Sequence, residues 1–251
     1  MRDALASALL AAQFLTRLPL PARGYTPARW ARAPGYFALA GLGLGLGLAG
    51  LFWAMAQVWP QSVAAVLTLG AGLILTGALH EDGLADCLDG LGGGRDRDRA
   101  LEIMRDSQIG SYGALGLGIV LGTQAVALAT TPLVTAIGAL VIGHTLGRAL
   151  MAQALGQGRY LRAKGAGTGM DEPLGRTGWA TTGLAVALSA LLALLVLGVA
   201  GTASAIAGGV VAGAVWRRWT RHRLGGDTGD TLGALHCVAL TGSFLGATAW
   251  A

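Results

Sequence analysis

Carboxylates crowd into one short stretch of this sequence, residues 76–113, TGALHEDGLADCLDGLGGGRDRDRALEIMRDSQIGSYG. Asp82, Asp86 and Asp89 are separated by steps of about 400° and 300° around a helix axis, so they should form one stripe. Unpaired carboxylates on one helix face repel each other. A bound cation would relieve that repulsion, so the stripe predicts a metal site.

A second acidic pair, Glu102 and Asp106, is four residues apart on the next predicted helix. The Gly-rich linker at 90–99 would let the two helices fold back so that five carboxylates face one another. Such oxygen ligands suit Mg²⁺, whereas Zn²⁺ prefers Cys and His. Glu81 lies off the first stripe, and its role stays open. The predicted metal ligands are Glu81, Asp82, Asp86, Asp89, Glu102 and Asp106.

The alternative is a solvated loop in which these acids pair with neighbouring arginines. We expect that arrangement for Asp96 and Asp98, which alternate with arginines in the Gly-rich loop. For Asp82, Asp86 and Asp89 the metal site is the favoured interpretation.

Carboxylates that hold a metal beside arginines are typical of phosphoryl-group chemistry. The predicted catalytic residues are Asp82, Asp86, Asp89 and His80. His80 borders the stripe and could bond a ligand or take a proton, and its alternative is a purely structural role. His222 and His236 show no comparable pattern.

Other connections carry groups that suit a phosphate-rich substrate. Residues 158–170, GRYLRAKGAGTGM, combine basic side chains with four glycines whose backbone N–H groups could approach an anion. His144 and Arg148 share a helix face, and Asp230 could either contact substrate or cap the last helix. The predicted substrate-binding residues are Arg105, Arg148, Arg159, Arg162, Lys164, Asp227 and Asp230.

The elements that position these residues are predicted to be membrane helices. The chain is 53% hydrophobic and only 12% charged, about half the charged fraction of soluble domains. Uncharged runs of about 20 residues indicate transmembrane helices. Seven such runs occur, at 34–57, 61–79, 109–131, 132–155, 177–200, 202–216 and 231–250, and only Arg148 places a charge inside one of them. We expect an all-α integral membrane protein that forms a single polytopic domain over residues 1–251.

Residues 1–33 are expected to form an interfacial segment, with an amphipathic helix that ends at Pro19 and Pro21. Arginines gather in alternate connections between the runs, which places those connections in the cytoplasm by the positive-inside rule. The N-terminus would then be cytoplasmic, the C-terminus outside, and the acidic catalytic face cytoplasmic. The basic segment 216–223, WRRWTRHR, is expected to be an interfacial anchor. Basic residues that border apolar runs indicate a lipid bilayer partner and no nucleic acid.

Several motifs resemble those of the cobalamin synthase family, the adenosylcobinamide-GDP ribazoletransferases. They are LHEDGLADCLDGLGGG at 79–94, RALEIMRDSQIGSYGALGLG at 99–118, AAQFLTRLPLP at 11–21 and TGDTLGA at 228–234. They occur in the order of the family and cover most of the chain. The sequence departs from the family pattern at Cys87, Leu88 and His236.

The resemblance implies a Mg²⁺-dependent transfer in the inner membrane. Adenosylcobinamide-GDP and α-ribazole, or its 5′-phosphate, would react to give GMP and adenosylcobalamin or its phosphate. A homo-oligomer, or a complex with other enzymes of cobalamin assembly, would be compatible with this role.

One alternative function is that of a CDP-alcohol phosphatidyltransferase, a family whose motif shares Asp86 to Gly90 but continues differently. A transporter with a structural metal is another alternative.

Overall fold

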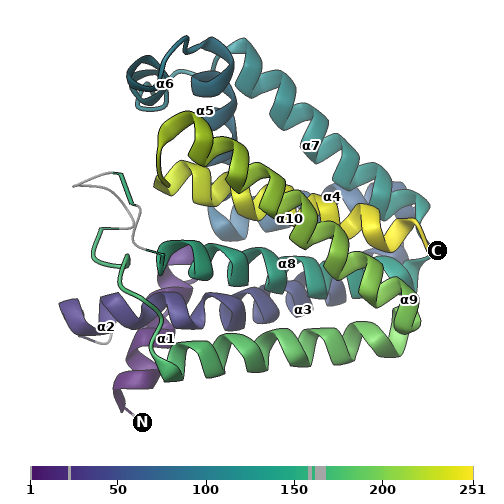
Figure 1. Cartoon of the computed structure of the whole chain (residues 1–251). Coiled ribbons are helices and arrows are strands. Elements are labelled where there is room, and N and C mark those ends of the chain that lie inside the picture. Colours follow the sequence, from purple (N-terminus) through teal and green to yellow (C-terminus); the bar gives the residue numbers. More distant parts are fainter. Residues whose placement is uncertain (1, 22–23, 158–159, 162–167, 251) are drawn as a thin grey trace.

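Helices make up nearly all of the regular structure in the computed structural model of the chain (Figure 1), which describes residues 2–21, 24–157, 160–161 and 168–250. The α-helices are α1 (Arg2–Leu15), α2 (Pro27–Arg32), α3 (Phe37–Ala56), α4 (Gln61–Thr76), α5 (Leu79–Gly93), α6 (Arg97–Ile103), α7 (Ser111–Thr130), α8 (Leu133–Leu155), α9 (Arg176–Leu224) and α10 (Gly229–Thr248). A 3₁₀ helix, η1 (Ala33–Tyr36), leads into α3. These described ranges contain no β-strand, which confirms the all-α prediction.

Most of the predicted spans correspond to single long helices. α3, α7, α8 and α10 begin and end within a few residues of the uncharged runs. Among the described helices, five are long and apolar enough to cross a membrane, or six if α4 and α5 count as one bent span. The chain is therefore a multi-pass helical membrane protein.

The fifth and sixth predicted spans lie together in α9, which has 49 residues. Gly198 interrupts this helix with φ 67° and ψ −176°, a backbone conformation open essentially only to glycine. Figure 1 shows that the ribbon of α9 folds back on itself, so the element has two arms.

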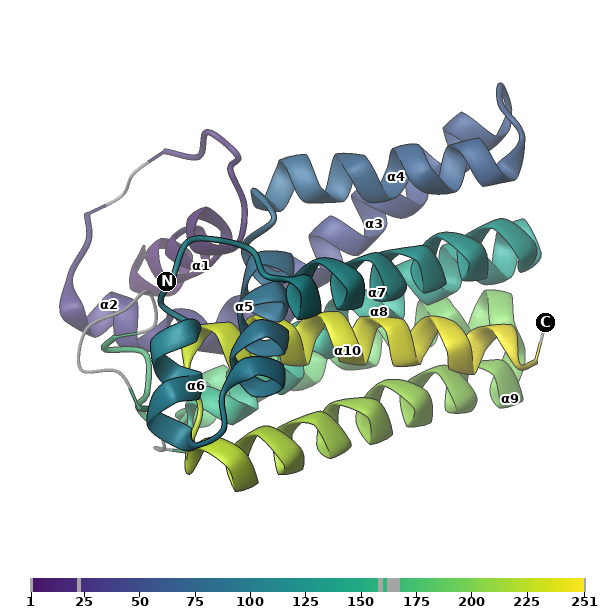
Figure 2. The same cartoon turned by 90° about the horizontal axis from the view of Figure 1, so that it is seen from above.

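A sharp bend separates α4 from α5. α4 ends where Gly77 and then Ala78 adopt left-handed conformations, with φ 66° and 54°. The two helix axes differ by 92°, and Figure 2 shows α5 turned away from the direction of α4. The prediction that the second span continues to Leu79 is thus wrong, because a left-handed residue ends an α-helix. The bend lays α5 against α7 and α10.

The N-terminal segment folds onto the bundle. α1 ends at Leu15, earlier than predicted, because the following chain leaves the helix and Arg17 donates its backbone N–H to Leu75 O at 2.7 Å. Arg29 of α2 donates from Nη2 to Asp3 Oδ1 at 2.7 Å. This hydrogen bond, together with the charge of Arg29, lowers the pKa of Asp3. The ion pair ties α2 to α1.

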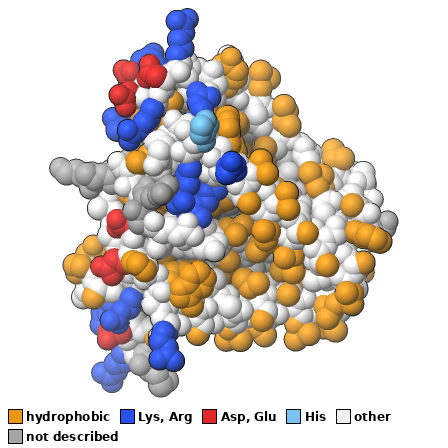
Figure 3. Space-filling model, viewed as in Figure 1, with side chains coloured by type: hydrophobic (Ala, Val, Ile, Leu, Met, Phe, Trp, Pro, Cys, Tyr) orange, Lys and Arg blue, Asp and Glu red, His pale blue; other side chains and the backbone are white. Residues whose placement is uncertain are grey.

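Charge and hydrophobicity divide the surface. Figure 3 shows Lys, Arg, Asp and Glu gathered at the end of the bundle that carries α2, α6 and the α9–α10 turn, which we call the charged end. The remaining surface in that view is largely apolar. α8 and α10 are mostly buried and form the centre of the bundle, whereas α9 exposes most of its apolar side chains. The candidate site lies at the charged end.

Candidate active site

A close approach of α5 and α10 creates the candidate site. A Cβ atom on Gly83 would lie 2.8 Å from Asp230 Cα, and one on Gly233 would lie 3.1 Å from His80 Cα. A methyl group at Gly83 would force the backbones apart, and one at Gly233 would be tight against His80, so the two glycines let α5 and α10 come this near. The contact brings Asp82 and Asp230, which are far apart in sequence, to the same part of the molecule.

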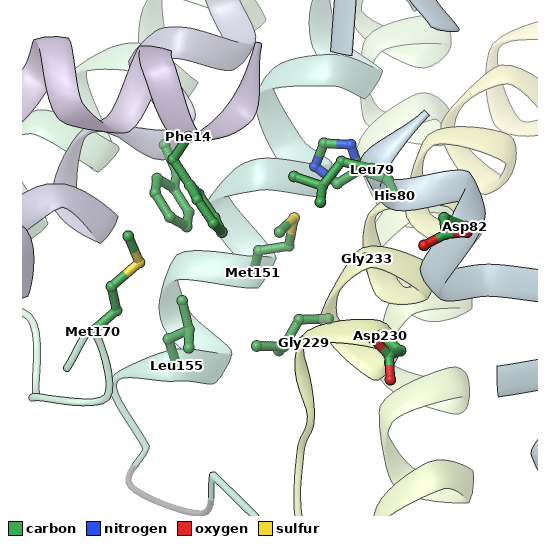
Figure 4. Close-up of a pocket in the computed structure, with 12 residues that line it drawn as sticks. Phe14, Leu79, His80, Asp82, Met151, Leu155, Met170, Gly229, Asp230 and Gly233 are labelled. Carbon is green, nitrogen blue, oxygen red and sulfur yellow. The ribbon is translucent and has the colours of Figure 1, made fainter. Parts of the chain in front are cut away.

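Asp82 and Asp230 border a hollow of about 90 Å³ at the charged end. Figure 4 shows both carboxylates beside it, one from α5 and one from α10. Its lining residues are Phe14, Phe37, Leu79, His80, Asp82, Met151, Leu155, Met170, Gly229, Asp230, Leu232 and Gly233. The hollow therefore joins an acidic edge to an otherwise apolar wall.

The three aspartates of the predicted stripe on α5 differ in their exposure to solvent. Asp82 is exposed, Asp86 is half-buried and Asp89 is only 8% exposed. Asp89 accepts hydrogen bonds from the backbone N–H groups of Gly110 and Gly113, at 2.7 and 2.8 Å. Those N–H groups belong to the start of α7, where a helix has unpaired donors and favours negative charge. Asp89 therefore docks α7 onto α5.

The second acidic pair does not join the first. Glu102 is exposed and accepts a hydrogen bond from Arg99 at 2.7 Å, and Asp106 accepts one from Gln108 N at 3.1 Å. Arg105 is also exposed. Across the described residues no group of three or more His, Cys, Asp or Glu side chains is placed to hold one metal ion. The prediction that five carboxylates face one another is wrong in this structure, because Asp89 and Glu102 have other partners.

The Gly-rich linker nevertheless folds back as predicted. α5 continues through Gly93, and Gly94 then turns the chain so that α6 returns along α5. A Cβ atom on Gly90 would lie 2.7 Å from Ala100 O, and one on Gly94 would lie 2.6 Å from Ala100 Cα. These glycines serve the close packing of α6 on α5. Asp96 forms the N-cap of α6 by accepting a hydrogen bond from Arg99 N at 2.9 Å.

Asp227 and Asp230 take different roles. Asp227 is 3% exposed, and Arg221 Nε donates to its Oδ2 at 3.0 Å. This ion pair stabilises the α9–α10 turn, so the predicted substrate contact of Asp227 is not available in this arrangement. The N-cap of α10 is Thr228, which forms a capping box with Thr231. Asp230 therefore does not cap the helix and instead lines the hollow.

The basic segment 216–223 mainly holds helices together. Trp219 is exposed, in keeping with an interfacial anchor, whereas Trp216 is buried and donates from Nε1 to Thr231 O at 3.2 Å. Arg223 donates to Gly94 O at 3.1 Å, at the end of α5. Part of the predicted anchor is therefore internal structure.

The predicted phosphate loop falls largely outside the described residues. Arg159, Arg162 and Lys164 belong to the parts of residues 158–167 that are not described. Next to them, Leu161 donates its backbone N–H to Asp227 O at 2.9 Å, which joins this loop to the α9–α10 turn. Further along the loop, Met170 lines the hollow. The substrate contacts of the basic residues stay a prediction.

Arg148 lies in a buried polar cluster behind the hollow. It is 1% exposed, and its Nη1 lies 3.1 Å from His144 Nδ1 and 3.3 Å from His236 Nε2. The rings of His236 and His80 have centroids 4.5 Å apart. Glu81 reaches the small inner cavity that Arg148 also lines. His80 alone among these residues also lines the hollow.

This cluster changes two predictions. Arg148 does not line the hollow, so its predicted phosphate contact is not supported by the observed packing. His236, for which no site role was predicted, bonds Arg148 across 88 residues of sequence. The spacing of His144 and Arg148 pointed to the cluster, but nothing in the sequence indicated a partner from α10.

Comparison with known proteins assigns the chain to a family. The sequence model of the family described as cobalamin-5-phosphate synthase matches residues 7–248. The chain belongs to the cobalamin-5-phosphate synthase family. This family match includes α5, α10 and every residue that lines the hollow.

Curated relatives carry the name adenosylcobinamide-GDP ribazoletransferase. The protein of that name from Leptothrix cholodnii is 42% identical over 250 residues, which cover 94% of this chain and 92% of the relative. The Shewanella amazonensis protein is 40% identical over 90% of this chain and 88% of its own length. The Vibrio cholerae protein is 36% identical over 90% of this chain and 87% of its own length. No solved structure matches this chain significantly.

Proposed function

We propose that this chain is a membrane transferase that joins the adenosylcobinamide phosphate group of adenosylcobinamide-GDP to α-ribazole or its 5′-phosphate. The observation that carries the proposal is the match to the family over residues 7–248, which includes the acidic hollow. The products are GMP and adenosylcobalamin or its phosphate.

The proposed reaction is a substitution at phosphorus in which one phosphate ester bond forms and one phosphoanhydride bond breaks. A ribose hydroxyl oxygen attacks the cobinamide-linked phosphorus, the bond from that phosphorus to the GMP oxygen breaks, and the hydroxyl loses its proton.

Divalent metal fits the acidic edge of the hollow. Asp82 and Asp230 line the hollow and offer carboxylate oxygens, the donors that Mg²⁺ prefers, and Mg²⁺ commonly takes one or two carboxylates and completes its shell with waters and substrate phosphates. We propose that these two residues hold Mg²⁺ together with substrate phosphates, whereas Asp89 has an occupied structural role. When bound, the ion would supply charge neutralisation for a diphosphate. The same carboxylates, supported by the glycine contact between α5 and α10, would orient the acceptor hydroxyl and receive its proton.

We further propose seven transmembrane spans in the inner membrane. The bent pair α4–α5 would count as one span, and the two arms of α9 as two, because Gly198 interrupts that helix. An odd number of spans puts the termini on opposite sides. The N-terminus would lie in the cytoplasm with the charged end, where arginines gather.

A comparison of two charge-matched variants tests the proposed function. The purified protein in lipid nanodiscs should release GMP when given adenosylcobinamide-GDP, α-ribazole and Mg²⁺. Asp82→Asn should lower kcat/KM roughly 100-fold, because it removes an anionic oxygen at the reacting phosphates. Asp98→Asn is the control, since Asp98 is exposed on α6 and does not line the hollow. Absence of GMP with the intact protein, or equal activity of the two variants, would contradict the proposal.

A further inference from the structure

The apolar wall of the hollow is built from side chains of α1, α3, α5, α8, the loop after α8 and α10. Phe14 of α1 and Phe37 of α3 stack with ring centroids 5.8 Å apart and planes 17° apart. Met151 of α8 and Met170 of the following loop line the same space, and Figure 4 shows these methionines near Phe14. Flat aromatic ligands pack well against aromatic rings and against flexible thioether side chains. The wall therefore suits a flat and mainly apolar ring.

A buried polar side chain lies where this wall meets the acidic edge. His80 is 1% exposed and lines the hollow. Among the described residues neither of its ring nitrogens has a hydrogen-bond partner. An unpaired buried polar group is costly, so a ligand that bonds His80 would recover part of that cost. One polar atom on the edge of a ring would satisfy it.

The apolar character of the wall indicates which ring of the two substrates can bind in the hollow. A guanine ring carries donors and acceptors along its edges, and burial against Phe14, Phe37 and Met151 would leave several of them unpaired. A corrin ring is far larger than a hollow of about 90 Å³ can enclose. Ribazole carries a substituted benzimidazole, a flat ring with little polar surface. This base fits the wall best.

We propose that the apolar wall of the hollow binds the base of the ribazole acceptor, with the ribose directed toward Asp82 and Asp230. This inference rests on the proposed function, and it assigns a specificity role to Met151 and Met170. His80 bonds a polar atom of the acceptor near the junction of base and ribose. Met151 and Met170 then limit the size of the base that can bind. The reacting ribose hydroxyl lies at the acidic edge of the hollow.

Binding of α-ribazole alone tests this assignment without any need for transfer. Isothermal titration of the protein in nanodiscs should give a Kd about tenfold weaker for Met151→Ala than for the intact chain, because a contact with the base is lost. Met170→Ala should show a similar loss and serves if Met151→Ala fails to fold. Met55→Ala is the matched control, since Met55 lies near the opposite end of α3 and does not line the hollow.

Kinetics then separate this inference from the proposed function. In Met151→Ala the KM for α-ribazole should rise while the KM for adenosylcobinamide-GDP stays within twofold. Unchanged binding of α-ribazole in both methionine variants would overturn the inference, and so would a KM increase confined to adenosylcobinamide-GDP. Methionine-dependent binding of α-ribazole without GMP release would support the subsite and contradict the proposed transfer.

Discussion

The carboxylates of α5 show how neighbouring residues of one type acquire different roles. Asp82 faces the hollow, whereas Asp89 binds two backbone N–H groups of α7. Helical spacing predicted that both would lie on one stripe, and it could not predict that α7 would begin against the last member. The sequence therefore identified the acidic helix and overestimated the number of carboxylates available to a ligand.

Asp89→Asn should destabilise the protein without removing its chemistry. The amide keeps one acceptor oxygen but turns an NH₂ group toward a backbone donor, so we expect a loss of about 1–3 kcal/mol. Thermal unfolding in detergent should show a lower midpoint than in Asp98→Asn, whose side chain is exposed on α6. Activity per folded molecule should stay within a few-fold of the intact chain. A large loss of activity with an unchanged midpoint would mean that Asp89 contacts substrate or metal.

At the scale of elements, the contact between α5 and α10 decides the geometry of the site. Uncharged runs were enough to predict the long helices α3, α7, α8 and α10 almost to their ends. They could not predict the 92° bend after α4, because Ala78 adopts a left-handed conformation that alanine rarely takes. They also could not indicate that Gly83 and Gly233 face another backbone. Contacts between helices that are distant in the chain belong to tertiary structure, and a single sequence does not indicate them.

Gly83→Ala tests the importance of this helix contact. The new methyl group would stand 2.8 Å from Asp230 Cα, so α5 and α10 must move apart. Overpacking of this kind costs about 1–3 kcal/mol, and a shift of about 1 Å in a site can lower activity by up to 100-fold. We expect kcat/KM to fall at least tenfold. Gly118→Ala on α7 is the control, because no described atom lies within 4 Å of its added carbon. Equal activity of the two variants would show that the contact does not position the acids.

At the scale of the whole molecule, charge is concentrated at one end of an apolar bundle, as Figure 3 shows. The arginines in alternate connections predicted that charge would gather at one end of the bundle. This prediction needs only the knowledge of which connections carry charge, because alternate connections lie on the same side of the membrane. The sequence also predicted seven spans, whereas the described helices give five, or six if α4 and α5 count as one bent span. The break at Gly198 in α9 is the basis of the proposed seventh span.

Reporter fusions test the proposed topology. With seven spans, alkaline phosphatase fused after Ala251 should be active in cells, because the C-terminus would lie outside the cytoplasm. Green fluorescent protein fused at that position should be dark, and the same protein fused before Met1 should fluoresce. Fluorescence from both ends would instead require an even number of spans.

The central claim is that Asp82 of α5 and Asp230 of α10 act together on one diphosphate at the charged end. A double-mutant cycle in kcat/KM for GMP release, with Asp82→Asn, Asp230→Asn and the combined variant, tests this claim most directly. Each single variant should lose roughly 100-fold, and the combined variant should be only a few-fold worse than the weaker single one, because a site that needs both acids is already lost with either. Multiplied losses in the combined variant, or full activity in either single one, would contradict a shared site.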